Sequence, residues 1–348
     1  MKKLYPLKFE PILKQVVWGG DSLVKKYGKQ VPCDDEGNPQ VDAAHIGESW
    51  EISDMEGHVS VVSNGFLKGN DLADILETYL GDLVGDNVFD FFNLQFPLLI
   101  KFLDIRDRLS VQVHPDDDTA MERYYSYGKT EMWYVMDAAP EAVVYMGFKR
   151  DTSAEEFYKA CKDGTVKDLM NEYHPKAGDS FFIKAGTVHS AGFGLTIAEI
   201  QESSDITFRL YDWGRENDPA TRREMFLEEA IDCIDYNRYD EESCLVRGGV
   251  GDYTLAQCRQ FIVRSLAIDG KRSVDMDGIE SMIIYMCTEG EAEFVTSDGE
   301  EPVRIKCGET VLIPASIDNL TVSPVTEGTR LMEAVIGHMD DVDGYFDE

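Results

Sequence analysis

The chain has 348 residues, 43% of them hydrophobic and 11% aromatic, which is typical of a folded globular protein with room for two domains. Its formal net charge of −33 at pH 7 excludes nucleic acid and anionic membrane surfaces as expected partners, because both would be repelled. This charge does not exclude a small anionic ligand, which needs only a local cluster of lysine and arginine side chains.

The N-terminal residues and the cysteines indicate a cytoplasmic protein. The opening segment MKKLYPLKFEPILKQVVWGG contains no apolar run long enough for a signal peptide, and no later stretch is long and apolar enough to span a membrane. The 7 cysteines include no CxxC pair, which indicates reduced thiols rather than a disulfide framework or a zinc knuckle.

The N-terminal part is predicted to combine short strands with one helical insertion. Residues 4–20 and 46–63 have the texture of short strands and turns. The insertion covers about 66–95, where apolar residues recur at helical spacing. These residues are Leu72, Ile75, Leu76, Tyr79, Leu80 and Leu83.

From Phe96 onward the sequence changes to a series of short strands separated by Gly, Pro and Asp turns. Many short strands with long excursions between them favour an antiparallel barrel or jelly roll decorated by helices. Two helices are predicted, over about 153–172 with Ser153 as N-cap, and over 218–234 with Pro219 in the first turn. The predicted strands are PLLIKFLDI, LSVQVH, TEMWYVMDA, AVVYMGF, DSFFIKA and LTIAEIQE.

A second strand-rich region begins near Tyr253 and runs to Ile336, after the charged segment YNRYDEESC. Within it, GETVLIPASIDN (308–319) aligns without gaps with GDSFFIKAGTVH (178–189) in the first region. This constant offset indicates a duplicated barrel. In the second copy, Asn319 stands at the position of His189.

A metal-binding constellation is predicted in the first region. Gln112 and His114 share one face of the strand SVQVH, because side chains alternate along a strand. Glu131 opens the next strand, and His189 ends another at a glycine turn. These side chains suit zinc, and equally Fe(II), Mn(II) or Co(II). In the alternative interpretation Glu131 is an exposed strand end and His189 a turn residue bonded to backbone.

The remaining histidines have no comparable context, and a lone histidine is more often solvated or hydrogen-bonded than a ligand. We expect no chemical role for His45, His58, His174 and His338.

Four motifs, in order along the chain, resemble type I mannose-6-phosphate isomerases in their shorter bacterial form. They are FPLLIKFLDIRDRLSVQVHPDD, GKTEMWYV, IKAGTVHSAG and QESSDITFRLYDWGR. The matching segments span Trp18 to Arg215, and the C-terminal part is similar in general pattern only. GDSFFIKAGTVH is also similar to the second cupin motif, with Lys184 where proline is usual.

The resemblance implies a mainly β fold of two cupin jelly-roll barrels, the second degenerate, with helical insertions. We expect residues 1–240 to form a metal-binding catalytic domain that carries the insertions at about 66–95, 153–172 and 218–234. We expect residues 241–348 to form a cupin-like β domain without metal ligands.

The resemblance also implies a cofactor and a reaction. One zinc ion per chain would be bound by Gln112, His114, Glu131 and His189, with the glutamine slightly off the metal. The substrate would be a sugar phosphate, interconverted between mannose 6-phosphate and fructose 6-phosphate. This aldose–ketose isomerisation moves a proton between C2 and C1 through a cis-enediol. The sequence does not fix the native metal, and we expect a monomer or weak dimer.

Such chemistry needs a cation beside the developing oxyanion and a base that moves the proton. Arg209 is the candidate cation, because arginine stays charged in any surroundings. Regular alternation would place it on one face with Asp205 and Thr207. The base is left open among Asp205, Glu202, Lys129 and a metal-bound hydroxide.

The resemblance also implies a substrate pocket that includes Trp18, Glu48 and Lys101, and we expect Ser110 to line it as well. Glu48 in GESWEISD resembles the family's N-terminal pocket carboxylate, although Trp18 could instead be a core anchor and Glu48 a turn cap. The phosphate is expected to meet Arg209 or a nearby lysine, since no GxxxxGK[ST] cradle occurs.

Two other functions are left open. A cupin Fe(II) oxygenase would use two imidazoles and a carboxylate with open positions. A sugar-binding or regulatory cupin would keep the pocket without turnover. Gln112, Lys129 and Arg209 favour isomerisation over oxygenation. A protein that only binds sugar would not need all of the predicted ligands together with Arg209.

Overall fold

The computed structural model describes residues 2–34, 36–276, 278–297 and 301–337. The chain divides into two compact units: unit 1 is Met1–Ile12, Glu51–Leu99 and Gly249–Glu348, and unit 2 is Leu13–Trp50 and Ile100–Gly248. This division differs from the linear boundary expected at 240/241, because 51–99, with the helical insertion, belongs with the C-terminal residues.

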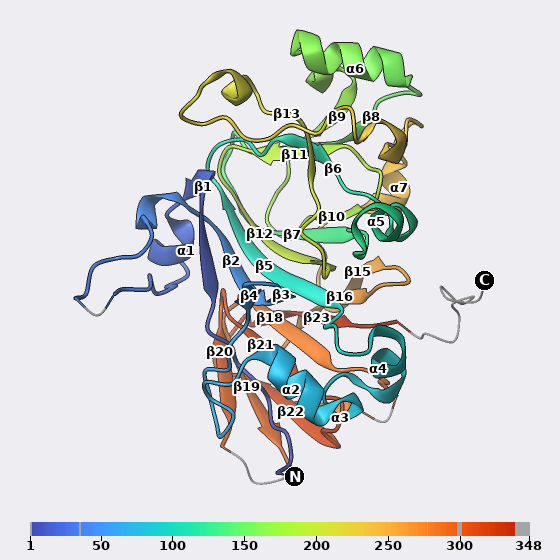
Figure 1. Ribbon diagram of the computed structural model, residues 1–348. Coiled ribbons are helices and arrows are strands. Elements are labelled where there is room, and N and C mark those ends of the chain that lie inside the picture. Colours follow the sequence, from blue (N-terminus) through green and yellow to red (C-terminus); the bar gives the residue numbers. More distant parts are fainter. Residues whose placement is uncertain (1, 35, 277, 298–300, 338–348) are drawn as a thin grey trace. The chain divides into compact units, whose positions relative to one another are not determined.

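Unit 2 is built on two antiparallel sheets whose inner faces share a core, as in a jelly roll (Figure 1). The larger sheet runs in the order β1 (Ile12–Gly20), β2 (Ile46–Ile52), β5 (Leu98–Ile105), β12 (Leu195–Glu202), β7 (Glu131–Ala138), β10 (Ser180–Ile183) and β14 (Leu245–Val246). The smaller sheet runs in the order β13 (Phe208–Tyr211), β6 (Val111–Val113), β11 (His189–Gly192), β8 (Val143–Phe148) and β9 (Met170–Tyr173).

The six strands predicted between 97 and 202 are confirmed as β5, β6, β7, β8, β10 and β12. Every residue of β5 is buried, which explains its continuous apolar run. Trp133 on β7 packs in the shared core with Val144, Met146 and Ala191 of the smaller sheet. This sandwich is the scaffold that brings the sites below together.

Helix α6 (Ala154–Asp163) begins as predicted but ends early. The Ser153 hydroxyl accepts a hydrogen bond from the backbone N–H of Glu156 at 3.1 Å. Gly164 adopts the left-handed conformation with φ 71°, which stops the helix before the expected limit at 172. The other short helices and 3-10 turns of unit 2 are α1 (Ser22–Lys25), α5 (Asp117–Tyr124), α7 (Glu241–Cys244), η1 (Ala43–His45), η2 (Val166–Asp168) and η3 (Arg215–Asn217).

The predicted helix over 218–234 is wrong. The segment consists of turns and one 3-10 turn, η4 (Ile231–Cys233). The backbone N–H of Phe226 donates to the carbonyl of Arg209 at 2.8 Å, and Arg209 Nη1 donates to the carbonyl of Glu224 at 2.6 Å. Tertiary hydrogen bonds to β13 therefore replace the bonds that a helix would need.

Unit 1 contains the second sandwich. One sheet runs in the order β15 (Tyr253–Gln257), β16 (Ile262–Ala267), β23 (Arg330–Val335), β18 (Ile283–Glu289) and β21 (Thr310–Ile313). The other runs in the order β17 (Arg272–Asp275), β22 (Asn319–Pro324), β19 (Glu291–Thr296) and β20 (Val303–Lys306). Side chains of both sheets form one apolar core, including Tyr285, Phe294, Leu320 and Leu331.

The helical insertion predicted over about 66–95 is confirmed and packs in unit 1. It consists of α2 (Leu72–Tyr79), α3 (Gly81–Val84) and α4 (Asp86–Phe92), preceded by the hairpin β3 (Asp54–Met55) and β4 (His58–Val59). The backbone N–H of Met282 donates to the carbonyl of Val84 at 3.0 Å. None of the helices in the described part of the chain has the length and apolar character that a membrane crossing requires.

The aligned segments 178–189 and 308–319 have the same local structure. Gly178 and Gly308 both have a left-handed φ, of 93° and 85°, before strands β10 and β21. Ile183 pairs with Glu131 in unit 2, and the aligned Ile313 pairs with Ile283 in unit 1. The register therefore supports the duplicated barrel and places Ile283 where the first copy has its glutamate.

Candidate active site

Three buried side chains from separate strands converge in unit 2. His114 directly follows β6, Glu131 begins β7, and His189 begins β11 rather than ending a strand as expected. His114 Nε2 lies 3.5 Å from Glu131 Oε2, and His189 Nε2 lies 3.1 Å from Glu131 Oε1. One potential ligand atom from each residue lies within 4.8 Å of the others, which is the spacing of a metal site.

Backbone carbonyls orient both imidazoles. His114 Nδ1 lies 2.9 Å from the carbonyl of Ile206, and His189 Nδ1 lies 2.8 Å from that of Thr187. A proton on each Nδ1 leaves the Nε2 lone pair directed at Glu131, as in metal sites where the second ring nitrogen is fixed by an outer partner. His114 Nε2 and both Glu131 oxygens are buried without a hydrogen-bond partner in the described residues.

The protonation states also suit a cation. Burial, followed by the nearby Lys129 ammonium, lowers the pKa of His114 to about 3, so its imidazole is neutral at pH 7. Burial alone would raise the pKa of Glu131, but Lys129 and His114 outweigh it and hold that pKa well below its usual value. One imidazole nitrogen from each of His114 and His189, together with the Glu131 carboxylate, forms a donor set that fits zinc or another divalent transition metal.

Gln112 lies beside this group at the edge of the cavity described below. Its Nε2 is 3.1 Å from His189 Nε2, and its Oε1 accepts a hydrogen bond from the Ser110 hydroxyl at 3.3 Å. Strand pairing places Gln112 directly opposite His189 on β11 and opposite Arg209 on β13. Rotation about one bond exchanges the oxygen and the nitrogen of the Gln112 amide, so either atom can face His189.

Lys129 is held by a tight turn rather than exposed to solvent. A Cβ on Gly128 would lie 2.6 Å from the Asp116 backbone, so only glycine allows this approach. The backbone N–H of Lys129 donates to the carbonyl of Pro115 at 3.0 Å. Its Nζ is buried and lies 3.5 Å from Glu131 Oε2.

A cavity of about 560 Å³ opens beside the three ligands. His114, Glu131 and His189 do not line it, but Gln112 and Lys129, which each contact one of them, do. Its volume falls within the usual range for small-molecule sites. Each of the predicted pocket or catalytic residues lines this cavity: Trp18, Glu48, Lys101, Ser110, Lys129, Asp205 and Arg209.

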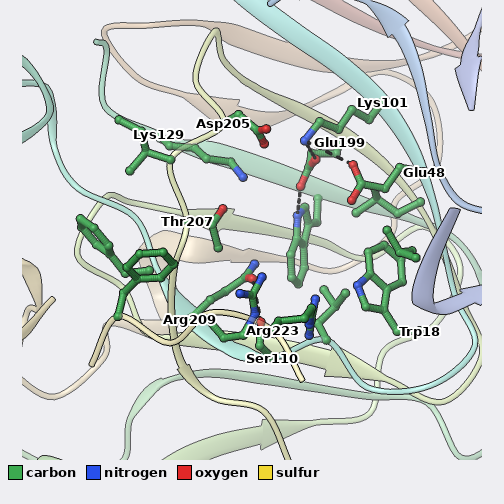
Figure 2. A pocket seen from close by; sticks show the side chains of 18 of the residues that line it. Trp18, Glu48, Lys101, Ser110, Lys129, Glu199, Asp205, Thr207, Arg209 and Arg223 are labelled. Atoms are coloured by element: carbon green, nitrogen blue, oxygen red, sulfur yellow. Dashed lines mark hydrogen bonds and ion pairs between the residues drawn. The ribbon is translucent and has the colours of Figure 1, made fainter. Parts of the chain in front are cut away.

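Lys101 lies in a buried charged group on one wall. Its Nζ is 3.3 Å from Glu199 Oε2 and 3.8 Å from Glu48 Oε2, and Figure 2 shows it between these carboxylates. Burial opposes its charge, but the two carboxylates outweigh that effect and raise the pKa of Lys101. Glu48 also accepts a hydrogen bond from Trp50 Nε1 at 2.7 Å. The lysine is therefore a fixed cation in the wall.

Arginine side chains gather at another part of the cavity, where Figure 2 shows Arg209 and Arg223 near Ser110. Arg223 Nη2 donates to the buried Asp212 at 2.6 Å, and Arg215 Nη2 donates to the same oxygen at 2.7 Å. Burial, followed by Arg223, lowers the pKa of Arg209 to about 10, which leaves it charged at pH 7. Two guanidinium groups, those of Arg209 and Arg223, line this part of the cavity and make it positive in an acidic protein.

Several cavity residues were not predicted from the sequence. Glu199 could have been noticed as an acidic residue inside the apolar strand LTIAEIQE. Arg223 lies in the segment wrongly predicted as a helix, and Trp133 had the pattern of an ordinary core residue. Glu202, a candidate base, accepts a hydrogen bond from the backbone N–H of Thr130 at 3.0 Å instead of lining the cavity.

None of the other histidines in the described residues lines the cavity or belongs to the group of three ligands. His45 is exposed and bonded to Asp42, and His174 is exposed beside Glu172. His58 is exposed on β4 in unit 1. His338 lies outside the described residues.

Comparisons with known proteins identify the family of this chain. The family model for the catalytic domain of phosphomannose isomerase type I matches residues 6–144. The chain is 31% identical to mannose-6-phosphate isomerase ManA of Bacillus subtilis (strain 168), over 92% of this chain and 97% of the relative. It is 32% identical to the mannose-6-phosphate isomerase of Streptococcus mutans, over 90% of this chain and 93% of the relative.

A solved structure extends the similarity to the fold. The crystal structure of mannose 6-phosphate isomerase from Bacillus subtilis superimposes with a TM-score of 0.80 at 26% identity, covering 96% of this chain and 100% of that one. The sequence relatives match over nearly the whole chain at 30% identity or more. The chain therefore belongs to the type I phosphomannose isomerases, a family of metal-dependent aldose–ketose isomerases.

Proposed function

We propose that this protein interconverts mannose 6-phosphate and fructose 6-phosphate, with one zinc ion held by His114, Glu131 and His189 and approached by Gln112. The observation that carries the proposal is that His114 Nε2 and both Glu131 carboxylate oxygens are buried without hydrogen-bond partners in the described residues. They lie next to a cavity that Arg209 and Arg223 line. A divalent ion bound there would polarise the oxygens of an open-chain sugar as a Lewis acid.

Arg209 is proposed to stabilise the negative charge that develops on oxygen when the proton beside the carbonyl is removed. Its guanidinium is charged and partly buried, and its Nε is without a hydrogen-bond partner in the described residues. A preorganised donor aimed at the enediolate oxygen lowers the barrier without itself gaining or losing a proton. The neighbouring Arg223 would favour the dianionic phosphate of the substrate in the same wall.

Asp205 and Lys129 are proposed to share the proton transfer. Asp205 is exposed at the cavity, and a carboxylate there can accept a proton from C2 or C1. Lys129, ion-paired with Glu131, is placed to donate a hydrogen bond to a sugar oxygen. This assignment gives the two residues distinct roles, which single substitutions at each can separate.

The remaining predicted pocket residues are proposed to orient the sugar. Lys101 and Glu48 offer a donor and an acceptor on the buried wall, and Ser110 offers a hydroxyl beside Gln112. Trp18 supplies an apolar surface in the cavity. Fixed polar groups on an apolar lining are the usual means by which small-molecule sites set orientation.

We also propose a cytoplasmic location and a monomer or weak dimer. All seven cysteines are free, which suits a reducing compartment. Sedimentation at several protein concentrations would test the assembly state. A stable higher oligomer would contradict it.

The experiment that tests the main proposal is a coupled assay for fructose 6-phosphate formed from mannose 6-phosphate, before and after chelation, with elemental analysis of the purified protein. We expect about one zinc per chain and activity that disappears with the metal and returns with zinc. Sugar binding without turnover by metal-loaded protein would select the regulatory cupin instead. Oxygen-dependent chemistry with iron would select the oxygenase.

A further inference from the structure

Unit 2 contains a buried cation–carboxylate–aromatic group on adjacent strands. Glu199 Oε1 accepts a hydrogen bond from Trp133 Nε1 at 2.7 Å, while its Oε2 lies 3.3 Å from Lys101 Nζ. Each carboxylate oxygen thus has its own partner. All three side chains are at most 5% exposed.

Unit 1 contains the same arrangement. Glu333 Oε2 accepts a hydrogen bond from the Tyr285 hydroxyl at 2.7 Å, while its Oε1 lies 2.9 Å from Arg264 Nη2. Again one oxygen has an aromatic donor and the other a cation. Tyr285 and Glu333 are buried, whereas the side chain of Arg264 is 45% exposed.

The strand registers show that these groups correspond. Glu199 is paired directly with Trp133 between β12 and β7, and Glu333 is paired directly with Tyr285 between β23 and β18. Trp133 stands two positions after Glu131, and Tyr285 stands two positions after Ile283, which occupies the position of Glu131 in the second copy. The polar group is therefore a repeated feature of both sandwiches.

What the aromatic ring contacts differs between the copies. Trp133 packs edge-to-face with the imidazole of His189, at 5.4 Å between ring centroids and 80° between ring planes. Tyr285 packs instead with Phe294 in an apolar core, at 5.2 Å and 40°. The repeated group thus supports a predicted metal ligand in unit 2 and a core residue in unit 1.

We infer that Trp133 is a positioning residue for the metal ligand His189, and that the hydrogen bond to Glu199 fixes the indole in that position. The bond from Nδ1 to Thr187 and the contact of Nε2 with Gln112 hold two points of the imidazole, but they leave the ring free to tilt about the line through these points. The indole face or edge restrains that tilt, and thereby the direction of Nε2. This inference rests on the proposed metal site.

The first test compares Trp133→Phe with the matched control Tyr285→Phe. Both changes remove the donor to a buried glutamate at the same register position, but only the first replaces a ring that packs against His189. We expect Trp133→Phe to weaken zinc binding about tenfold, the lower end of the effect of losing an outer partner. Tyr285→Phe should leave zinc binding within about twofold of the unaltered protein, as measured by competition with a chromogenic chelator.

The second test compares Glu199→Leu with Glu199→Gln. Both remove the charge next to Lys101, but only glutamine keeps an oxygen that can accept the indole N–H. We expect the leucine variant to bind zinc several-fold more weakly than the glutamine variant. Circular dichroism identifies any variant that fails to fold. If a Glu199 variant does not fold, the comparison of Trp133→Phe with Tyr285→Phe still tests the positioning role of Trp133.

The outcomes separate this inference from the proposed function. If the unaltered protein binds no divalent metal, the proposed site itself is wrong. If the unaltered protein binds zinc and folded Trp133→Phe binds it equally well, the metal site stands and the positioning role is overturned. The role is also overturned if Tyr285→Phe weakens zinc binding as much as Trp133→Phe does.

Discussion

The two β sandwiches have the same register around β10 and β21 but different residues at the positions that matter chemically. In unit 2 those positions hold Glu131 and His189, and in unit 1 they hold Ile283 and Asn319. Ile283 is fully buried in an apolar core. The sandwich therefore needs neither ligand to fold, and burial of a charged group at Glu131 costs free energy unless a partner compensates. Function is the better reason for the ligands of unit 2.

The largest effect is expected when an imidazole is removed from unit 2. We expect His114→Ala and His189→Ala to lose zinc and activity together. Loss of a direct ligand should weaken zinc binding by more than the loss of an outer partner does, which is usually about 10- to 100-fold. Elemental analysis and the coupled isomerase assay measure the two losses. His174→Ala, which changes an exposed histidine, serves as control, and full zinc in either ligand variant would contradict the assignment.

The next largest effect concerns the positive wall of unit 2. We expect Arg209→Ala to keep zinc but to lower kcat by about 10²–10³, the usual cost of a lost oxyanion donor. Arg209→Lys retains a charge without the planar fork and should recover only part of the rate. Loss of zinc from Arg209→Ala would show that the residue supports the metal site rather than the transition state.

The third effect is on stability and concerns the carboxylate that holds the arginine wall together. Asp212 is fully buried, and although burial alone would raise its pKa, Arg223 and Arg215 hold that pKa below its ordinary value of 3.8. Its contribution to stability is therefore complete above pH 3.8 and is lost as the pH falls through its folded-state pKa. We expect Asp212→Asn to lower the free energy of unfolding by about 3 kcal/mol at pH 7.

Urea unfolding at pH 7 and below pH 3.8 measures this difference, which should shrink in acid. Asp232→Asn is the matched control, because Asp232 also pairs with an arginine but is 61% exposed. A surface pair of this kind contributes at most about 1 kcal/mol. A difference between wild type and Asp212→Asn that stays constant with pH would mean that the ion pairs are not its cause.

The smallest effect is expected in the second sandwich. Asn319 is exposed, so Asn319→Ala should change the free energy of unfolding by less than about 0.5 kcal/mol and leave turnover unchanged. Asn319→His restores the imidazole of the aligned position, but Ile283 still supplies no carboxylate. We therefore expect elemental analysis to find no additional zinc in that variant. A second zinc ion per chain would show that unit 1 can bind a metal without the carboxylate.

Sequence reasoning was successful for features with a local cause. The strand-like composition of LSVQVH and TEMWYVMDA between turn residues predicted the strands near Gln112 and Glu131, and the helical spacing over 66–95 predicted α2 to α4. The Ser153 cap was correct because its hydrogen bond joins residues three apart. The helix over 218–234 was wrong because the segment forms hydrogen bonds with Arg209 on β13, which lies outside it, and no pattern within the segment shows this.

Residue type and strand alternation are local properties, and they were enough to identify the side chains that could serve as ligands. The three-dimensional arrangement was needed to show that Glu199, Trp133 and Arg223 line the cavity, and that 51–99 belongs with the C-terminal residues. The physical reason is that these contacts depend on strand register and on hydrogen bonds between distant residues, which no local pattern encodes.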